Sequence, residues 1–206
     1  MRLAVNPTRM ELLRLKRRLI LSRRGHKLLK DKQDELMKHF LELVKKEKEL
    51  RPVVEEKLKR AYHHFLIARG NMWPEVIETV LSMPERRMEL EVSMERILNV
   101  KVPKYTLSGE RFGFSYGFFN TSGDLDTSMT ILCETIPLLI ELSEVVKSIK
   151  LLAHEIKRTK RRVNALEYIL IPSLEETISY ITMKLSELER SNLTRLMRVK
   201  EIVRKS

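Results

Sequence analysis

The sequence contains few of the residues that form tight turns or covalent crosslinks. Its 206 residues include six glycines, seven prolines and one cysteine, and only 6% of them are aromatic. Glycine and proline together reach about half of their average share, which excludes collagen-like chains and argues against an all-β sandwich. The single Cys133 excludes a disulfide scaffold and any paired-cysteine metal or redox site. These absences favour long helices in a reducing compartment.

Long apolar runs are also missing. No stretch approaches the ~18 apolar residues that span a membrane, so we expect no transmembrane helix. The first residues carry charge but no apolar core, so we do not interpret them as a secretory signal.

Charge, in contrast, is abundant and unevenly distributed. Charged residues make up 33% of the sequence, and the net charge is +12. Residues 1–32 contain eleven Lys and Arg against two acids, five of the six residues 157–162 are basic, and residues 110–144 have a net charge of −5. Such basic segments usually have an acidic neighbour, either nucleic acid or an acidic protein cavity, unless they form only a solvated helix surface. Nucleic-acid binding has little support, because no basic-zipper pattern, helix-turn-helix or zinc module is present.

Residues 8–51 are predicted to form one long helix with a continuous apolar seam. Thr8 and Glu11 have the spacing of a capping box, in which each side chain satisfies the other's backbone donor. His26 falls on the seam and is predicted to be a packed or interhelical polar residue. A repeat of 3.5 residues is typical of a left-handed coiled coil, so this helix needs a partner helix. The apolar seam positions are Leu12, Leu15, Leu19, Leu29, Leu36, Phe40 and Leu43.

Residues 138–206 show the same rhythm. Ala153 and Lys160 also fall on the seam in this register, and two consecutive steps of four between Leu170 and Ile178 make a stutter, which locally unwinds a supercoil. Pro172 lies inside the stutter, and because proline removes a backbone hydrogen bond we expect a kink there. The apolar seam positions are Ile156, Val163, Leu166, Leu170, Ile181, Leu185 and Leu188.

Residues 52–137 differ in composition and are predicted to form a head. Residues 53–69 and 75–83 have helical patterns, and residues 87–103 alternate as in a β-hairpin that turns near Glu95–Asn99. Residues 105–128 are predicted to be a loop. Within it, Arg111–Tyr116 resembles part of an RNA-binding strand motif but lacks its first glycine, so we expect its aromatic residues to pack under the head or against a partner.

Two long helices at opposite ends of one chain must pair with each other. The predicted fold is therefore mainly α. A long antiparallel two-helix coiled coil, the shaft, is made by residues 1–51 and 138–206 and carries a small middle head of short helices and a β-hairpin. Both termini should then lie at one tip, with Leu12 close to Val199.

No set of residues rises above background as a catalytic or ligand-binding site. The string at His154 begins like a zinc-protease motif, but Arg158 occupies the position of the second histidine. The adjacent His63 and His64 point to different faces of a helix, and no phosphate-binding loop is present. Cys133 has no neighbouring base and is predicted to be a buried structural thiol. We therefore expect no catalytic residue, no metal site and no cofactor.

Both ends of the sequence resemble a known family. The start has Asn6-Pro7-Thr8-Arg9, then Leu12, Leu15, Lys16, Leu19, Gly25, Leu28-Leu29-Lys30 and Lys32. It resembles the D subunit of the archaeal and vacuolar-type rotary ATPases. The family's C-terminal signature is similar to the long run Glu155–Tyr168, followed by Ile171-Pro172, Thr177-Ile178 and Tyr180-Ile181. The hairpin departs from the family, which usually has glycine where Asn99 precedes Val100-Lys101-Val102-Pro103.

This resemblance implies the central-stalk rotor of an A-type ATP synthase, which couples proton or sodium flow to ATP synthesis and has no catalytic residues or cofactor of its own. In that family the paired helices enter a hexamer of catalytic A and non-catalytic B subunits, while the head binds the F and C subunits, the second of which is a funnel to the membrane ring. The chain would lie peripherally at the cytoplasmic face of the cell membrane, with no nucleic acid among its partners. The candidates for contact with the hexamer are Arg17, Arg18, Arg23, Arg24, Arg158, Lys160, Arg161 and Arg162.

Other functions stay open at this point. An ATP-driven V-type ion pump would use a rotor with the same mechanics, although the compact length and high charge are more typical of archaeal or bacterial proteins and favour synthesis. A cytoplasmic coiled-coil scaffold would form a self-associated dimer. A basic nucleic-acid-binding protein would bind DNA with a steep dependence on salt.

Overall fold

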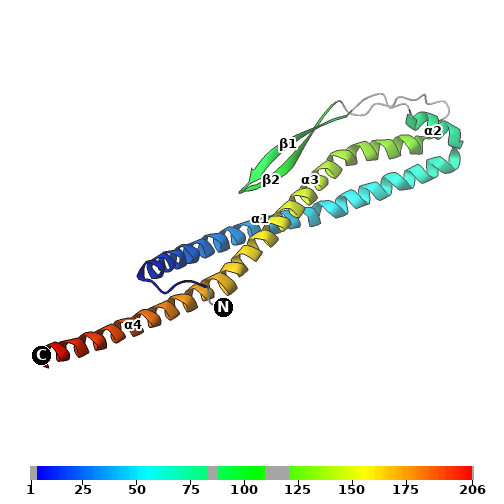
Figure 1. Ribbon diagram of the computed structural model, residues 1–206. Helices are drawn as coiled ribbons and strands as arrows, with labels where there is room; N and C mark the ends of the chain where they lie inside the picture. The colour runs from blue at the N-terminus through cyan, green and yellow to red at the C-terminus, as the bar shows by residue number, and fades with distance from the viewer. Residues whose placement is uncertain (1–3, 83–87, 110–120, 206) are drawn as a thin grey trace. The chain divides into compact units, whose positions relative to one another are not determined.

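The structure is a computed structural model, and the fold is described for residues 4–82, 88–109 and 121–205. In chain order (Figure 1) its elements are α1 (Arg9–Asn71), α2 (Pro74–Ser82), β1 (Glu89–Ile97), β2 (Val100–Ser108), α3 (Gly123–Ala165), η1 (Leu166–Leu170) and α4 (Ile171–Lys205). They form two compact units. The terminal unit comprises Met1–Glu35 with Ile156–Ser206, and the central unit comprises Leu36–Glu155. The predicted mainly helical fold with a small hairpin is confirmed.

Helix α1 begins with half of the predicted capping box. The backbone N–H of Glu11 donates to Thr8 Oγ1 at 3.3 Å, which satisfies one of the free donors of the first turn. The reciprocal bond is replaced, because the Thr8 N–H donates to the carbonyl of Asn6 at 2.9 Å. The Glu11 carboxylate instead accepts a bond from Arg14 at 3.2 Å.

Helix α1 does not end at Arg51 but continues through Pro52 to Asn71. Pro52 cannot donate to the carbonyl of Lys48, yet both residues are exposed, so water can satisfy that carbonyl. The buried stripe also continues beyond the proline at heptad spacing, with Val54, Ala61 and Ala68 all 5% exposed or less. Packing of this stripe therefore outweighs the cost of one missing backbone bond.

The second long helix likewise begins earlier than predicted. Helix α3 starts at Gly123 rather than near residue 138 and passes through the exposed Pro137. Residues 123–128, which we expected in a loop, are its first turns, and Leu125 and Ser128 are buried there. The aromatic string Arg111–Tyr116 lies outside the described residues.

In the central unit, α1 and α3 pair antiparallel. Ion pairs join Lys46 to Glu141 at 2.6 Å and Lys57 to Glu134 at 3.8 Å. The residue number of the partner in α3 falls as the residue number in α1 rises, as it must for antiparallel helices. The short helix α2 begins with Pro74, which is favoured as a first helical residue because the N–H it lacks would have no partner there. The carbonyl of Trp73 accepts hydrogen bonds from the N–H groups of Val76 and Ile77.

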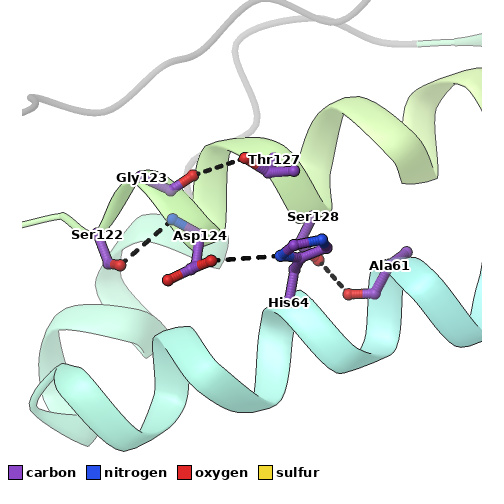
Figure 2. Close-up of polar contacts among 7 residues, drawn as sticks. All are labelled: Ala61, His64, Ser122, Gly123, Asp124, Thr127 and Ser128. Atoms are coloured by element: carbon purple, nitrogen blue, oxygen red, sulfur yellow. Dashed lines mark hydrogen bonds and ion pairs between the residues drawn. The ribbon is translucent and has the colours of Figure 1, made fainter.

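Polar contacts fix the end of this pair (Figure 2). The Ser128 hydroxyl donates to the Ala61 carbonyl at 2.7 Å, which requires the two backbones to lie close together. One turn earlier in α3, His64 Nδ1 lies 3.2 Å from Asp124 Oδ1, and the Asp124 N–H donates to Ser122 Oγ at 3.3 Å. Ser122 therefore caps α3, while Asp124 occupies the first turn, where an acid is favourable.

In the terminal unit, the first half of α1 packs against η1 and α4. The core contains Leu15, Leu174 and Ile181, and the partly buried residues around it are Leu12, Leu19, Leu170, Ile178, Tyr180 and Leu185. Two ion pairs of 2.6 Å, Arg9–Glu189 and Arg23–Glu175, set the register. From the first ion pair to the second, the residue number rises by fourteen in α1 and falls by fourteen in α4. The two helices are therefore antiparallel and keep the same register over two heptads.

The buried seam of the second helix lies one residue before the predicted seam along part of α3, from Val145 to Leu152, and again at Thr159. Leu152 and Thr159 are buried, whereas the predicted seam residues Ala153 and Lys160 are exposed. The buried positions Ser148, Leu152 and Ile156 follow each other in steps of four, so a stutter already occurs before Lys160.

A wide turn lies where the kink was predicted. Residues Leu166–Leu170 form a π-helical segment, in which the Ile171 N–H donates to the Leu166 carbonyl. Pro172 follows at once and cannot donate the α-helical bond to the carbonyl of Tyr168. The helix therefore accommodates its proline by adding a residue to one turn.

The predicted hairpin is present and longer than expected. Strands β1 and β2 pair antiparallel from Ile97↔Val100 out to Glu89↔Ser108, so residues 104–108 are strand. The two-residue turn has positive φ at Leu98 (55°) rather than at Asn99. The Tyr105 N–H donates to the Glu144 carboxylate at 2.9 Å and thereby attaches β2 to α3.

Two leucines of α4 provide a matched test of this packing. Leu174 is 0% exposed and Leu196 is 65% exposed. Leu174→Ala should lower the free energy of unfolding by about 2–5 kcal/mol, because it leaves a cavity in the seam. Leu196→Ala should change it by less than about 0.5 kcal/mol. Urea unfolding of the isolated chain, followed by circular dichroism, measures both, and equal effects would contradict the seam described above.

Candidate functional site

The terminal unit carries a basic surface. We use this name for the eight predicted contact residues, all of which are exposed: Arg17, Arg18, Arg23, Arg24, Arg158, Lys160, Arg161 and Arg162. Four lie on α1 and four on α3. On α3 the cations point outward because Thr159 and Val163, at 2% and 5% exposure, occupy the buried stripe between them.

The cations of the basic surface are almost all unneutralised. Within the described part of the chain, Arg23 alone among them has an ion-pair partner, Glu175. Exposed ion pairs are worth only ~0–1 kcal/mol each, so a partner that formed separate ion pairs with these residues would be bound only weakly at each of them. Their summed potential would still attract an acidic surface at longer range.

The structure does not bring the eight residues to one level. Arg23 lies beside Glu175, and His26 Nε2 lies 3.4 Å from Glu167 Oε2. Arg162 precedes Glu167 by five residues, so along the helix axis it lies about 7 Å from the His26–Glu167 contact, on the side away from Arg23. Arg17 and Arg18 lie on the opposite side of that contact, nearer the start of α1. The basic surface is therefore spread along the helix pair rather than gathered into a ring.

Helix α4 extends well past the start of α1, which is visible within the terminal unit in Figure 1. Arg9, the first residue of α1, pairs with Glu189, and α4 continues to Lys205. These sixteen further residues span about 24 Å. Every residue from Ser186 to Arg204 is exposed. We call residues 190–205 the free end.

The free end corrects two predictions. Leu188 is 53% exposed, so the packed seam stops at Leu185. Val199 lies ten residues, or about 15 Å, beyond Glu189 and is not close to Leu12. Pro7 and the cap at Thr8 fix where α1 begins, whereas α4 continues to Lys205. The exposed apolar residues of the free end are Leu193, Leu196, Met197, Val199, Ile202 and Val203.

An exposed apolar pair was missed by the sequence analysis. Tyr168 and Ile169, in the π turn, are 71% and 66% exposed. Neither belongs to the seam. The proline four residues after Tyr168 was the available signal, because it predicts a local departure from the α-helical repeat.

The described residues show no arrangement suited to catalysis. They contain no group of three or more His, Cys, Asp and Glu side chains that could hold a metal ion. Cys133 is half-buried, and burial raises the pKa of its thiol, which keeps it protonated and unreactive. His26 makes an interhelical contact with Glu167, and His64 is engaged by Asp124. No helix in the part of the chain covered by the structure is both long and apolar enough to cross a membrane.

Comparison with known proteins gives a consistent result. The family described as the ATP synthase D subunit matches residues 11–201 of this chain. A protein of Acetivibrio thermocellus, named as a V-type ATP synthase D subunit, is 55% identical over 203 residues, which cover 97% of this chain and 91% of that protein. Proteins of the same name from Thermoanaerobacter sp. and Clostridium novyi are 50% and 51% identical, covering 98% and 99% of this chain and 97% of each relative.

The free end should be the first part of the isolated chain to be cleaved. Its residues 190–204 are exposed rather than packed on α1, so its backbone opens more easily than that of the paired helices. Brief trypsin treatment should cut after Arg195 and Arg198 before it cuts after Arg17 or Arg24, which are also exposed but lie on a packed helix. Mass spectrometry of a time course measures the order. Simultaneous cleavage at both places would show that pairing gives α1 no protection.

Proposed function

The chain belongs to the family of ATP synthase D subunits, and from this membership we propose that it is the central-stalk rotor of an A-type ATP synthase. As a member of the family it is a subunit of a rotary ATPase. The proposed task is to transmit rotation between a membrane ring and a catalytic hexamer, so that proton or sodium flow drives ATP synthesis. An ATP-driven pump would use the same mechanics in the opposite direction.

The observation that carries this proposal is the antiparallel helix pair of the terminal unit. Its interior includes the fully buried Leu174 and Ile181, and its outer surface carries the exposed cations of the basic surface. Packed in this way, the pair can turn as one body. The free end adds a second accessible region that a surrounding ring could enclose.

The mechanism follows from symmetry. A shaft of two helices has no threefold axis, so inside three catalytic interfaces it must contact each one differently. Each contact biases its interface toward a different open or closed state, because a contact shifts an equilibrium only by its differential affinity for the two states. A turn of the shaft then exchanges the three states. The chain itself needs no catalytic residue for this task.

The basic surface suits a sliding contact. We propose that it faces acidic loops of the A and B subunits, which line the bore of the hexamer. The cations are spread along the pair and are exposed, so each contact is weak and can be exchanged as the shaft turns. The attraction as a whole still holds the shaft in place.

The remaining partners are assigned to the central unit. We propose that residues 52–137, with the hairpin β1–β2, bind the F and C subunits, the second of which is the funnel that connects to the membrane ring. The chain would then associate with the cytoplasmic face of the cell membrane only through its partners. The exposed apolar residues Leu90, Val92 and Met94 of β1 give this unit a surface that a partner protein could cover.

Stoichiometry tests the proposal as a whole. The tagged full-length chain, isolated from its native cell at low salt, should co-purify with a hexamer of A and B subunits at one copy per hexamer. Native mass spectrometry counts the copies. A self-associated dimer without the hexamer would instead support a coiled-coil scaffold, and recovery with DNA that is lost steeply with salt would support a nucleic-acid-binding protein.

Charge reversal tests the basic surface. Arg161→Glu with Arg162→Glu should weaken binding to the A/B hexamer about tenfold, or about 1.4 kcal/mol, and make the binding less dependent on salt. Helical content and unfolding midpoint should stay unchanged, because both side chains are exposed. The control is Lys59→Glu with Arg60→Glu, an exposed pair in the central unit with the same change in charge. If both double variants bind and support turnover like the wild type, the cations are only a solvated surface.

A further inference from the structure

Strand β1 is exposed on both faces of the hairpin. Every residue from 89 to 96 is exposed, including the apolar Leu90, Val92 and Met94 at 49%, 56% and 67%. Strand β2 differs, because three of its residues are buried and its backbone is attached to α3. β1 is therefore the outer strand of the hairpin.

The backbone of β1 presents hydrogen-bonding groups along its outer edge. Directly opposite residues of an antiparallel pair alternate between those that bond each other and those whose backbone groups point away. Tyr105 is of the second kind, because its N–H donates to Glu144 of α3 and not to Val92, the residue opposite. Leu90 and Met94 lie two residues on either side of Val92 and share its orientation. The N–H and C=O groups of these three residues therefore point outward.

This edge lacks the features that usually prevent strand pairing. Exposed edge strands are normally protected by proline, lysine, a bulge or a short length. β1 has nine residues, pairs with β2 in one unbroken register and contains neither proline nor lysine. The exposed apolar residues of the helices differ, because their backbone groups are bonded within the helix. β1 can therefore accept a third strand.

The two faces of β1 differ in chemistry, because its side chains alternate. One face carries the three apolar residues, with Arg96 near the turn, and the other carries Glu89, Glu91 and Glu95. Glu95 is engaged by Lys104 of β2 at 3.5 Å. The first half of β1 thus combines an open backbone edge with an apolar face and an acidic face.

The acidic face restricts the identity of the third strand. A second copy of β1 would gather the glutamates of both copies on one face, because outward-pointing residues must bond each other, and like charges on neighbouring strands are destabilising. Nucleic acid would be repelled by the same glutamates. An extended protein segment in which apolar residues alternate with Lys or Arg would cover the apolar face and neutralise the acidic one.

We propose that β1 binds such a basic, alternating segment of a partner protein as a third strand on its outer edge. The backbone groups of Leu90, Val92 and Met94 form the hydrogen bonds, and the two faces set the sequence preference. This inference goes beyond the proposed function, because it states how β1 binds and does not require the chain to be a rotor.

A synthetic peptide tests the proposal on the isolated full-length chain. The probe is a nonapeptide with blocked ends that alternates Lys with Val, and NMR measures the exchange of backbone amide protons with solvent. In the free chain the amides of Leu90, Val92 and Met94 should exchange faster than those of Glu91 and Ser93, which bond to β2. Saturating probe should slow the three outward amides at least about tenfold, because each then donates a hydrogen bond.

Modified peptides separate the backbone from the charge. Only one alternate set of N–H groups in the added strand can face β1. N-methylation of that set should weaken binding at least about tenfold, whereas N-methylation of the other set should change it less than about threefold. A peptide that alternates Glu with Val should leave the wild type unprotected but bind the variant Glu89→Lys with Glu91→Lys, which should no longer bind the Lys–Val probe.

A matched pair of variants tests the edge from the side of the chain. Val92→Pro removes an outward N–H and leaves the bonds to β2 in place, so the probe should bind at least about tenfold more weakly while Glu91 and Ser93 keep their protection. Val92→Ile keeps the N–H and an apolar side chain, and it should bind within about twofold of the wild type.

Several outcomes would overturn the inference. Failure of the Lys–Val probe to bind, equal effects of the two N-methylated peptides, or equal binding of the Glu–Val peptide by the wild type would each exclude it. Protection of the outward amides in the free chain would show that the edge is already covered. A second copy covers it if this protection rises with concentration, and residues 111–116, outside the described residues, cover it if Phe112→Ser with Phe114→Ser removes the protection. None of these measurements involves the A and B subunits, so failure of the rotor proposal would leave them unchanged.

Discussion

In each unit of this chain, the packing depends mainly on a strip of contact between antiparallel helices. A pair of helices has no other interior, so all the apolar area that it removes from water must lie along that strip. Leu15, Leu174 and Ile181 form it in the terminal unit, and Leu36, Val54 and Leu152 are among the residues buried in the central unit. Small polar residues share it. The Thr135 and Thr177 hydroxyls donate to carbonyls one turn earlier in their own helix, both at 2.6 Å, which satisfies these donors at buried positions.

Three prolines show how far this constraint extends. Pro52 and Pro137 lie inside α1 and α3 on exposed faces, where water can satisfy the freed carbonyls and the strip continues past them. Pro172 lies between the buried residues Ser173 and Leu174 on one side and the half-buried Leu170 and Ile171 on the other. Pro172 is exposed as well, but it comes two residues after the π turn at Leu166–Leu170. The same residue type is thus accommodated in two ways, within a regular helix or beside a turn that is wider than an α-helical one.

The sequence predicted the helices, their antiparallel pairing and the hairpin, because each rests on a strong period of 3.5 or 2 residues. It failed at element ends, where a proline was interpreted as a stop although its exposed position made it tolerable. It also assigned Lys160 rather than Thr159 to the strip, since a search for apolar residues passes over a buried threonine. The basic surface was visible as composition. Its spread along the pair was not, because the level of each cation depends on a register that is set by contacts such as Arg23–Glu175. Pro172 signalled a local departure from the helical repeat near Tyr168, but it did not show which side chains the turn exposes.

The free end has a mechanical consequence. Resistance of a rod to bending rises steeply with its thickness, and α4 is left without its partner beyond the point where α1 begins at Arg9. The terminal unit is therefore a stiff double rod whose last sixteen helical residues form a thinner, more compliant cantilever. A tip of this kind bends at its root, while the paired part behind it keeps its geometry.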